Sequence, residues 1–177
     1  IFTSSLRPSN GIASGAYGGI LQAKLGRNGG HFSTSSTSFV DVTYMNVTLT
    51  PTKQQSTFLI LVSFGRASTR QSNLDHASEF RVMRQIGSGS FTEAHSVNGR
   101  SEGSRSRGCM TVGGLAFNDD HSIGSFAVVG CDGTNTTSAV TYKIQVRVQS
   151  SSHPLTLNRS YNNNNGSEVY QSSCQSS

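Results

Sequence analysis

Apolar and polar residues alternate most regularly over residues 139–149, AVTYKIQVRVQ. The apolar members share one parity: Val140, Tyr142, Ile144, Val146 and Val148. Threonine, lysine, glutamine and arginine occupy the other parity, which is the pattern of a β-strand with one face buried and one face in water. The segment therefore predicts a strand of a sheet that is covered on one side.

Shorter apolar segments bounded by turn residues recur along the chain. We expect strands within residues 19–26, 79–86, 109–117, 122–130 and 154–160, with a weaker candidate at 168–174. In the first of these, Leu21, Ala23 and Leu25 share one parity, as in a half-buried strand. Arg84 interrupts the apolar face of residues 79–86. Residues 66–78 and 87–108 have no period and are predicted to be long polar loops.

Residues 57–64, TFLILVSF, are apolar on both parities. A strand of this kind is typical of the centre of a sheet with both faces covered. The cover is expected to come from the opposite sheet or from another subunit.

One break in the pattern occurs within residues 39–51. The apolar side chains stay in phase up to Tyr44 and resume one residue out of phase at Val47. Since a slip of one residue turns every later side chain to the opposite face, we predict a β-bulge near Met45 and Asn46. The Ser/Thr run before it, residues 32–38, is interpreted as sheet or as the approach to a sheet.

These segments give roughly eight to nine strands and no helical period of useful length. Two packed antiparallel sheets, a jelly-roll-like β-sandwich, are the expected all-β fold. We assign residues 19–177 to this single domain and residues 1–18 to an N-terminal arm or tether rich in Gly and Ser. The arm holds the candidate assembly contacts: Ile1, Phe2, Leu6, Ile12 and Tyr17.

Composition supports this interpretation and narrows the function. Ser and Thr together number 47 of 177 residues, Trp is absent and the formal net charge is +5. The densest basic group lies in residues 100–108, with Arg100, Arg105 and Arg107 as a candidate exposed basic loop. An anion site, a solvated loop or arginines that pair with a neighbouring subunit explain it, whereas nucleic acid is not an expected partner because no aromatic residues are interleaved.

The sequence offers little reactive chemistry. It has no nucleophile elbow, phosphate-binding loop or HExxH motif, so we expect no enzyme, catalytic residue, metal or other cofactor. Two clusters could supply ligands to a divalent ion, Glu93 with His95 and Asp119 and Asp120 with His121, but ordinary loop polarity explains both. No apolar run is long enough to span a bilayer, and no membrane partner is expected.

The three cysteines, Cys109, Cys131 and Cys174, lack metal-ligand spacing. Cys109 and Cys131 each lie at the end of a predicted strand and could form a disulfide bond if those strands are neighbours. Small buried thiols are the preferred interpretation.

Six motifs occur in an order that resembles a family of small virion structural proteins and fibre domains of tailed bacteriophages, particularly marine and cyanobacterial ones. They are FSTSSTSFVDVTYMNVTLTP, STFLILVSF, FRVMR, SRSRG, AVTYKIQVRV and LTLNRS, and the resemblance spans about residues 19–170. It implies a β-sandwich that forms homotrimers and a structural or attachment role on the virion, and it brings no catalytic residues. The chain departs from the family's pattern in its polar ending, EVYQSSCQSS, and in its N-terminal arm.

The expected function is that of a capsid decoration, cement or short head-fibre subunit on the virion surface. Its expected partners are itself, as a homotrimer, and the major capsid protein or another virion protein. One alternative is the receptor-binding tip of a tail fibre or spike, which binds a host surface glycan through residues 66–78 and 87–108. A further alternative is a subunit of an extracellular filament, assembled by strand exchange through residues 1–18.

Overall fold

Strands account for the regular structure in the part of the chain that the computed structural model describes, residues 22–69, 77–104, 106–112 and 124–159. No helix occurs among these residues. Their nine strands are β1 (Phe32–Thr34), β2 (Val40–Leu49), β3 (Thr57–Thr69), β4 (Ser78–Ile86), β5 (Thr92–Glu93), β6 (Met110–Val112), β7 (Gly124–Gly133), β8 (Val140–Val148) and β9 (Leu155–Leu157).

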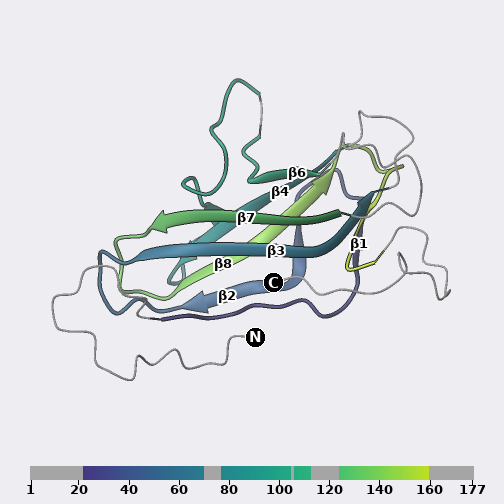
Figure 1. Cartoon of the computed structure of the whole chain (residues 1–177). Coiled ribbons are helices and arrows are strands. Elements are labelled where there is room, and N and C mark those ends of the chain that lie inside the picture. Colours follow the sequence, from purple (N-terminus) through teal and green to yellow (C-terminus); the bar gives the residue numbers. More distant parts are fainter. Residues whose placement is uncertain (1–21, 70–76, 105, 113–123, 160–177) are drawn as a thin grey trace.

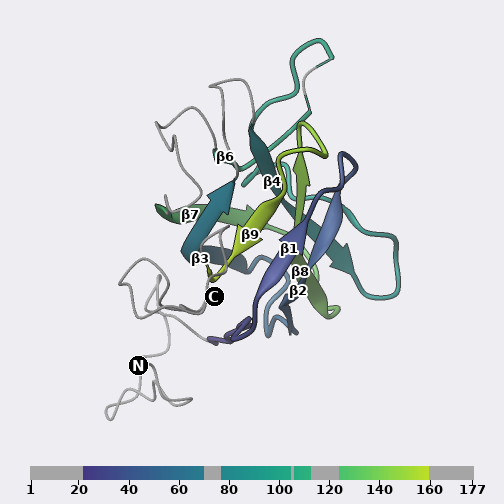
Figure 2. The same cartoon turned by 90° about the vertical axis from the view of Figure 1, so that its right-hand side faces the viewer.

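The strands pair as one long antiparallel hairpin that is rolled up on itself (Figure 1). β1 pairs with β9, β2 with β8 and β3 with β7, while β4 pairs with β5 and β6. Rolling adds the pairings of β3 with β9 and of β4 with β8. Two antiparallel sheets result, β1-β9-β3-β7 and β2-β8-β4-β5, with β6 also beside β4. In Figure 2, β3, β9 and β1 lie side by side in this order. The predicted jelly-roll sandwich is confirmed.

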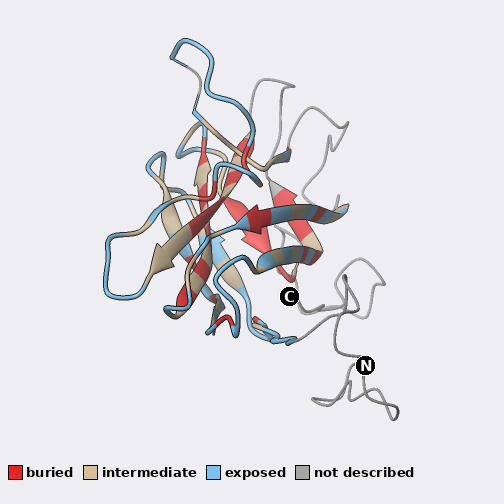
Figure 3. Cartoon of the chain, turned by 90° about the vertical axis from the view of Figure 1, so that its left-hand side faces the viewer, coloured by how far each residue is buried: buried red, intermediate tan, exposed pale blue. Residues whose placement is uncertain are grey.

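The core fills the space between the two sheets. Along β8 every second residue from Val140 to Val148 is buried, as the alternation predicts. The rings of Phe64 on β3 and Phe80 on β4 meet across the layers with centroids 4.7 Å apart. Figure 3 shows the buried residues on the strands and the exposed ones mainly on the loops.

The predicted bulge in β2 is confirmed in position and is larger than expected. Asp41 is opposite Gln145 and Asn46 is opposite Lys143, so five steps along β2 (46 minus 41) match two along β8 (145 minus 143). Three extra residues are therefore accommodated, where the pattern indicated one. Tyr44 adopts a φ of 63°, and its side chain turns outward and is 72% exposed. The apolar side chains on either side of it, Val42 and Met45, are both buried.

The Ser/Thr run of residues 32–38 carries the chain from one sheet to the other. β1 belongs to the sheet of β9, whereas β2 belongs to the sheet of β8. Between them the Ser36 amide donates to Thr34 Oγ1 at 3.1 Å, and the Ser38 amide donates to Ser36 Oγ at 3.2 Å. These local bonds from hydroxyl side chains replace ladder bonds at the corner.

Three expectations about element positions are wrong. Residues 22–26 do not form the expected strand, and Leu25 is 69% exposed. Gly26 lies against the backbone carbonyl of Asn46 at the β2 bulge and not in a strand ladder. β3 continues to Thr69, beyond the predicted loop boundary at residue 66, because it pairs with β9 there. β5 lies within the predicted loop 87–108. The candidate strand 168–174, much of 109–117, and the arm contacts Ile1, Phe2, Leu6, Ile12 and Tyr17 fall outside the described residues.

Candidate functional site

The outer face of the β2-β8-β4-β5 sheet carries matched charges on neighbouring strands. Its ion pairs are Lys143–Asp41 at 2.9 Å, Arg81–Glu93 at 3.1 Å and Arg147–Glu79 at 2.7 Å. Gln145 joins two of them, since its Oε1 accepts from Arg81 Nε at 2.9 Å and its Nε2 donates to Asp41 Oδ1 at 2.7 Å. Opposite charges on adjacent strands stabilise a sheet and keep its surface hydrated.

The pKa of the Asp41 carboxyl group is affected by these neighbouring groups. Partial burial by itself would raise its pKa, but the hydrogen bonds from Lys143 and Gln145, together with the charge of Lys143, outweigh burial and lower the pKa below its ordinary value. The group therefore stays ionised on the outer face at neutral pH.

Two aromatic rings lie against the cations of the same face. The guanidinium carbon of Arg81 is 3.8 Å from the centroid of the Phe39 ring, and that of Arg147 is 4.8 Å from it. Lys143 Nζ lies 4.0 Å from the centroid of the Phe91 ring. Such cation–π contacts hold long side chains in place and give the charged face an ordered surface.

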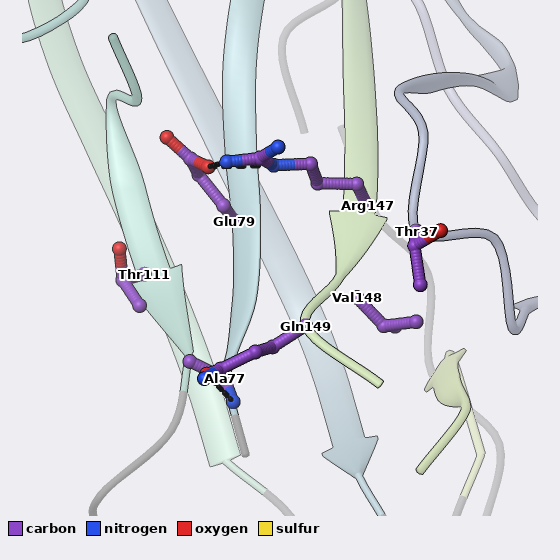
Figure 4. A pocket seen from close by; sticks show the side chains of 7 residues that line it. All are labelled: Thr37, Ala77, Glu79, Thr111, Arg147, Val148 and Gln149. Carbon is purple, nitrogen blue, oxygen red and sulfur yellow. Dashed lines mark hydrogen bonds and ion pairs between the residues drawn. The ribbon is translucent and has the colours of Figure 1, made fainter. Parts of the chain in front are cut away.

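A shallow hollow of about 290 Å³ opens beside the Arg147–Glu79 pair. Thr37, Ala77, Glu79, Thr111, Arg147, Val148 and Gln149 line it (Figure 4). The Gln149 side chain accepts from the amide of Ala77 at 3.4 Å, and Ser106 Oγ donates to both oxygens of Glu79. The hollow thus offers hydrogen-bonding groups to a small polar ligand, near the lower size limit of ligand pockets.

The candidate basic loop lies between β5 and β6 and projects from the sandwich (Figure 1). Arg100 is exposed on it, as expected. Arg107 is not: its side chain is 29% exposed, and its Nε lies 3.7 Å from Glu93 Oε2 because the loop returns to the sheet there. Arg105 lies outside the described residues. Of the two described arginines, Arg100 is therefore free of the sheet, whereas Arg107 is held near Glu93.

The candidate ligands Glu93 and His95 do lie on the same side, with His95 Nε2 3.9 Å from Glu93 Oε2. The Glu93 carboxylate also faces Arg81 and Arg107, so cations already surround it. Across the residues that the structure covers, no group of three or more His, Cys, Asp or Glu side chains could hold a metal ion. Asp119, Asp120 and His121 lie outside those residues.

A buried carboxylate connects the two sheets. Asp132 on β7 is 1% exposed and accepts from Arg84 Nη1 on β4 at 2.9 and 2.8 Å, from Ser96 Oγ at 3.1 Å and from Tyr142 Oη at 2.8 Å. Arg84, the interruption in the pattern of β4, therefore points inward toward a buried partner. Burial, with the hydrogen bond to Asp132, raises the pKa of Tyr142. In the sequence, the only signal of this site is the arginine within an otherwise apolar strand face. Its partner Asp132 could be identified only from the way the strands pack in the structure.

The outer face of β3 and β7 has the opposite character. Its outward positions, which we call the β3–β7 face, are Thr57, Leu59, Leu61, Ser63, Ala127, Val129, Cys131 and Gly133. Within the described chain the opposite sheet covers one face of β3: Val62 and Phe64 are buried, whereas Leu59 is 58% and Leu61 65% exposed, and cover of this second face by another subunit stays a prediction. The apolar residues on the second parity therefore lie on an open surface.

The two described cysteines are free. Cys109 is partly buried, close to the expected buried thiol: its Sγ donates to the Phe80 carbonyl at 3.4 Å, and burial raises its pKa to about 11. Cys131 differs because it is exposed on the β3–β7 face. Cys174 lies outside the described residues.

Comparison with known proteins adds no family to this description. No protein-family model matches the sequence, and no curated protein matches it. In the described part of the chain there is also no helix long and apolar enough to cross a membrane.

Proposed function

We propose that the chain is a structural protein of a virus particle, exposed on the particle surface, that acts through assembly contacts and not through catalysis. The observation that supports this best is the nested pairing β1–β9, β2–β8 and β3–β7. This jelly-roll topology recurs in viral capsid proteins. The order of sequence motifs that resembles small virion proteins points the same way, and it favours a viral role over the lectins and cupins that share the topology.

Under this proposal the chain is a capsid decoration, cement or short head-fibre subunit. It associates with itself as a homotrimer and with the major capsid protein or another virion protein, and residues 1–18 form the arm that contacts the shell. The two outer faces of the sandwich suit different roles. The face with the Arg147–Glu79 and Lys143–Asp41 pairs suits the hydrated particle surface, and the uncharged β3–β7 face suits a protein contact.

Imaging of native particles tests the proposal. Fab fragments raised against the full chain are expected to label the capsid shell in cryo-EM maps at positions that repeat with the capsid lattice. Labelling confined to the tail contradicts the decoration role. Particles that lack both the label and the chain in mass spectra contradict a virion role altogether.

The hollow beside Arg147 supports a second candidate function, recognition of a host surface glycan by a fibre tip. Its threonines, Gln149 and the Arg147–Glu79 pair can donate to and accept from sugar hydroxyls. The test is a glycan array with the full chain and with Thr111→Arg, which fills the hollow. Thr48→Arg, at another exposed threonine of the same sheet, is the control. Binding that Thr111→Arg removes and Thr48→Arg retains supports this function, and an array without binding contradicts it.

A further inference from the structure

The β3–β7 face carries a contiguous apolar patch. Leu59, Leu61 and Val129 are 58%, 65% and 68% exposed. The register places Leu61 opposite Val129 and Leu59 opposite Cys131, so these side chains are direct cross-strand neighbours. Single exposed apolar residues are normal on protein surfaces, but a contiguous group of them marks an interaction site.

No charged side chain interrupts this patch. Every outward position from Thr57 to Ser63 and from Ala127 to Gly133 is apolar, hydroxyl-bearing or glycine. Asp132, the charged residue of β7, points inward and is buried. The hydroxyl groups of Thr57 and Ser63 stand at the two ends of the β3 row, so the patch has an apolar centre with a polar limit, as protein interfaces do.

β7 is also an edge of its sheet. Among the described strands it pairs with β3 alone, which leaves the other side of a ten-residue strand without a ladder partner. Edge strands of soluble proteins are usually protected by outward lysines, by prolines or by a covering element. β7 has no lysine and no proline. Its one charged residue, Asp132, points inward, so the outward side chains of β7 leave the strand open to a covering partner.

The charge distribution indicates which partner fits. The chain has a formal net charge of +5, so two copies repel each other at long range. The β3–β7 face offers copies a surface on which they can meet without burying any charged side chain, whereas a contact through the β2-β8-β4-β5 face would bury ion pairs. A strongly charged partner surface would instead lose solvation here without gaining an ion pair.

We infer that copies of this chain meet through the β3–β7 face, with Leu59, Leu61 and Val129 at the centre of the contact. This inference rests on the proposed function in that a homotrimer is part of it, and it adds the surface and the occupant. Each row of the face is seven residues long, about 23 Å at about 3.3 Å per residue. A stable contact buries about 800 Å² per partner, so the contact must extend beyond these two rows.

Light scattering and sedimentation of the full chain test the inference with a pair of matched variants. Leu61→Glu places a charge at the centre of the face. Leu25→Glu places the same charge at a leucine of similar exposure, 69% against 65%, outside the face. We expect the parent chain and Leu25→Glu to have three times the monomer mass of 18.8 kDa, and Leu61→Glu to have the monomer mass at the same concentration.

A second readout uses the exposed thiol of the face. Peptide mapping after a short maleimide pulse is expected to show Cys131 protected in the parent chain and modified in Leu61→Glu, with unchanged circular dichroism. Should Leu61→Glu misfold, Val129→Lys provides the same test on β7.

A monomeric parent chain overturns the inference, and so does an oligomer that survives both Leu61→Glu and Val129→Lys. A monomer in which Cys131 is nevertheless protected means that another part of the same chain covers the face, which also overturns it. Particle labelling together with a monomeric chain leaves the virion role in place and removes only this inference. A dimer that Leu61→Glu dissociates supports the inference and contradicts the trimer.

Discussion

Replacing Asp132 by asparagine is expected to destabilise the fold strongly, because the change removes a buried charge from a site built around it. Asp132 is 1% exposed and accepts four hydrogen bonds from three side chains: Arg84, Ser96 and Tyr142. Asparagine keeps the size of the side chain. The variant therefore reports the loss of charge and of acceptor capacity, with little change in packing volume.

The expected loss of stability follows from leaving Arg84 without its counter-ion. The Arg84 side chain is 23% exposed and loses its counter-ion, and removing one partner of a buried ion pair costs about 3–5 kcal/mol. Asp41→Asn is the matched control, since Asp41 also pairs with a cation but is 53% exposed. Exposed pairs contribute about 0–1 kcal/mol, so the two Asp→Asn changes should differ several-fold.

The assay is urea denaturation, followed by far-UV circular dichroism at one fixed protein concentration, because association would otherwise shift the midpoint. The double variant Asp132→Asn with Arg84→Met should lose less than the sum of the single losses, because removing the cation relieves its unpaired burial. A loss below about 1 kcal/mol for Asp132→Asn, or strict additivity in the double variant, would refute this account of the site.

Three further outcomes are expected. Burial raises the pKa values of Cys109 and Tyr142, so the folded state favours the protonated form of both groups. The free energy of unfolding is therefore unaffected by these groups below pH 9.0. It falls as the pH rises further, by about 1.4 kcal/mol per pH unit for each titrating group. Urea midpoints between pH 8 and 11 should show this fall, smaller in Cys109→Ser from pH 9.0 and in Tyr142→Phe from pH 10.0. Gly130→Ala should cost about 1–3 kcal/mol in the same assay, because its Cβ would stand 2.8 Å from Val97 Cγ1, and Val97→Ala should restore part of the loss. Added salt should lower the stability difference between the parent chain and Asp41→Asn while leaving that of Asp132→Asn nearly unchanged, because ions screen exposed pairs more than buried ones.

The sequence predicts the fold well where one face of a strand is buried and the other is in water. β8 shows this best, because its alternation from Val140 to Val148 continues without a break. The bulge in β2 was also readable, since a phase change in the pattern has no other simple explanation in a strand. Its size was not, because the extra residues depend on Tyr44 adopting a positive φ, which apolar spacing does not encode.

Sequence patterns failed where the environment of a segment is set by distant parts of the chain. Residues 19–26 alternate like a strand, but their described part, which ends at Gly26, lies against the backbone of the β2 bulge. Arg84 looked like a defect in an apolar face until the register brought Asp132 and Tyr142 beside it. The same holds for the β3–β7 face: its two-sided apolar pattern was visible, but which parity is open depends on how the sheets stack.

The nested pairing of the strands has a consequence for how the protein is made. The first described strand, β1, pairs with the last, β9, and Phe32 stands opposite Leu157, 125 residues later. At about 5–20 residues per second, a ribosome needs about 6–25 s to synthesise that interval. During this time β1 has no ladder partner, and a chain with such long-range pairing folds slowly once complete. The sandwich therefore cannot close before residues 155–157 of β9 have been synthesised.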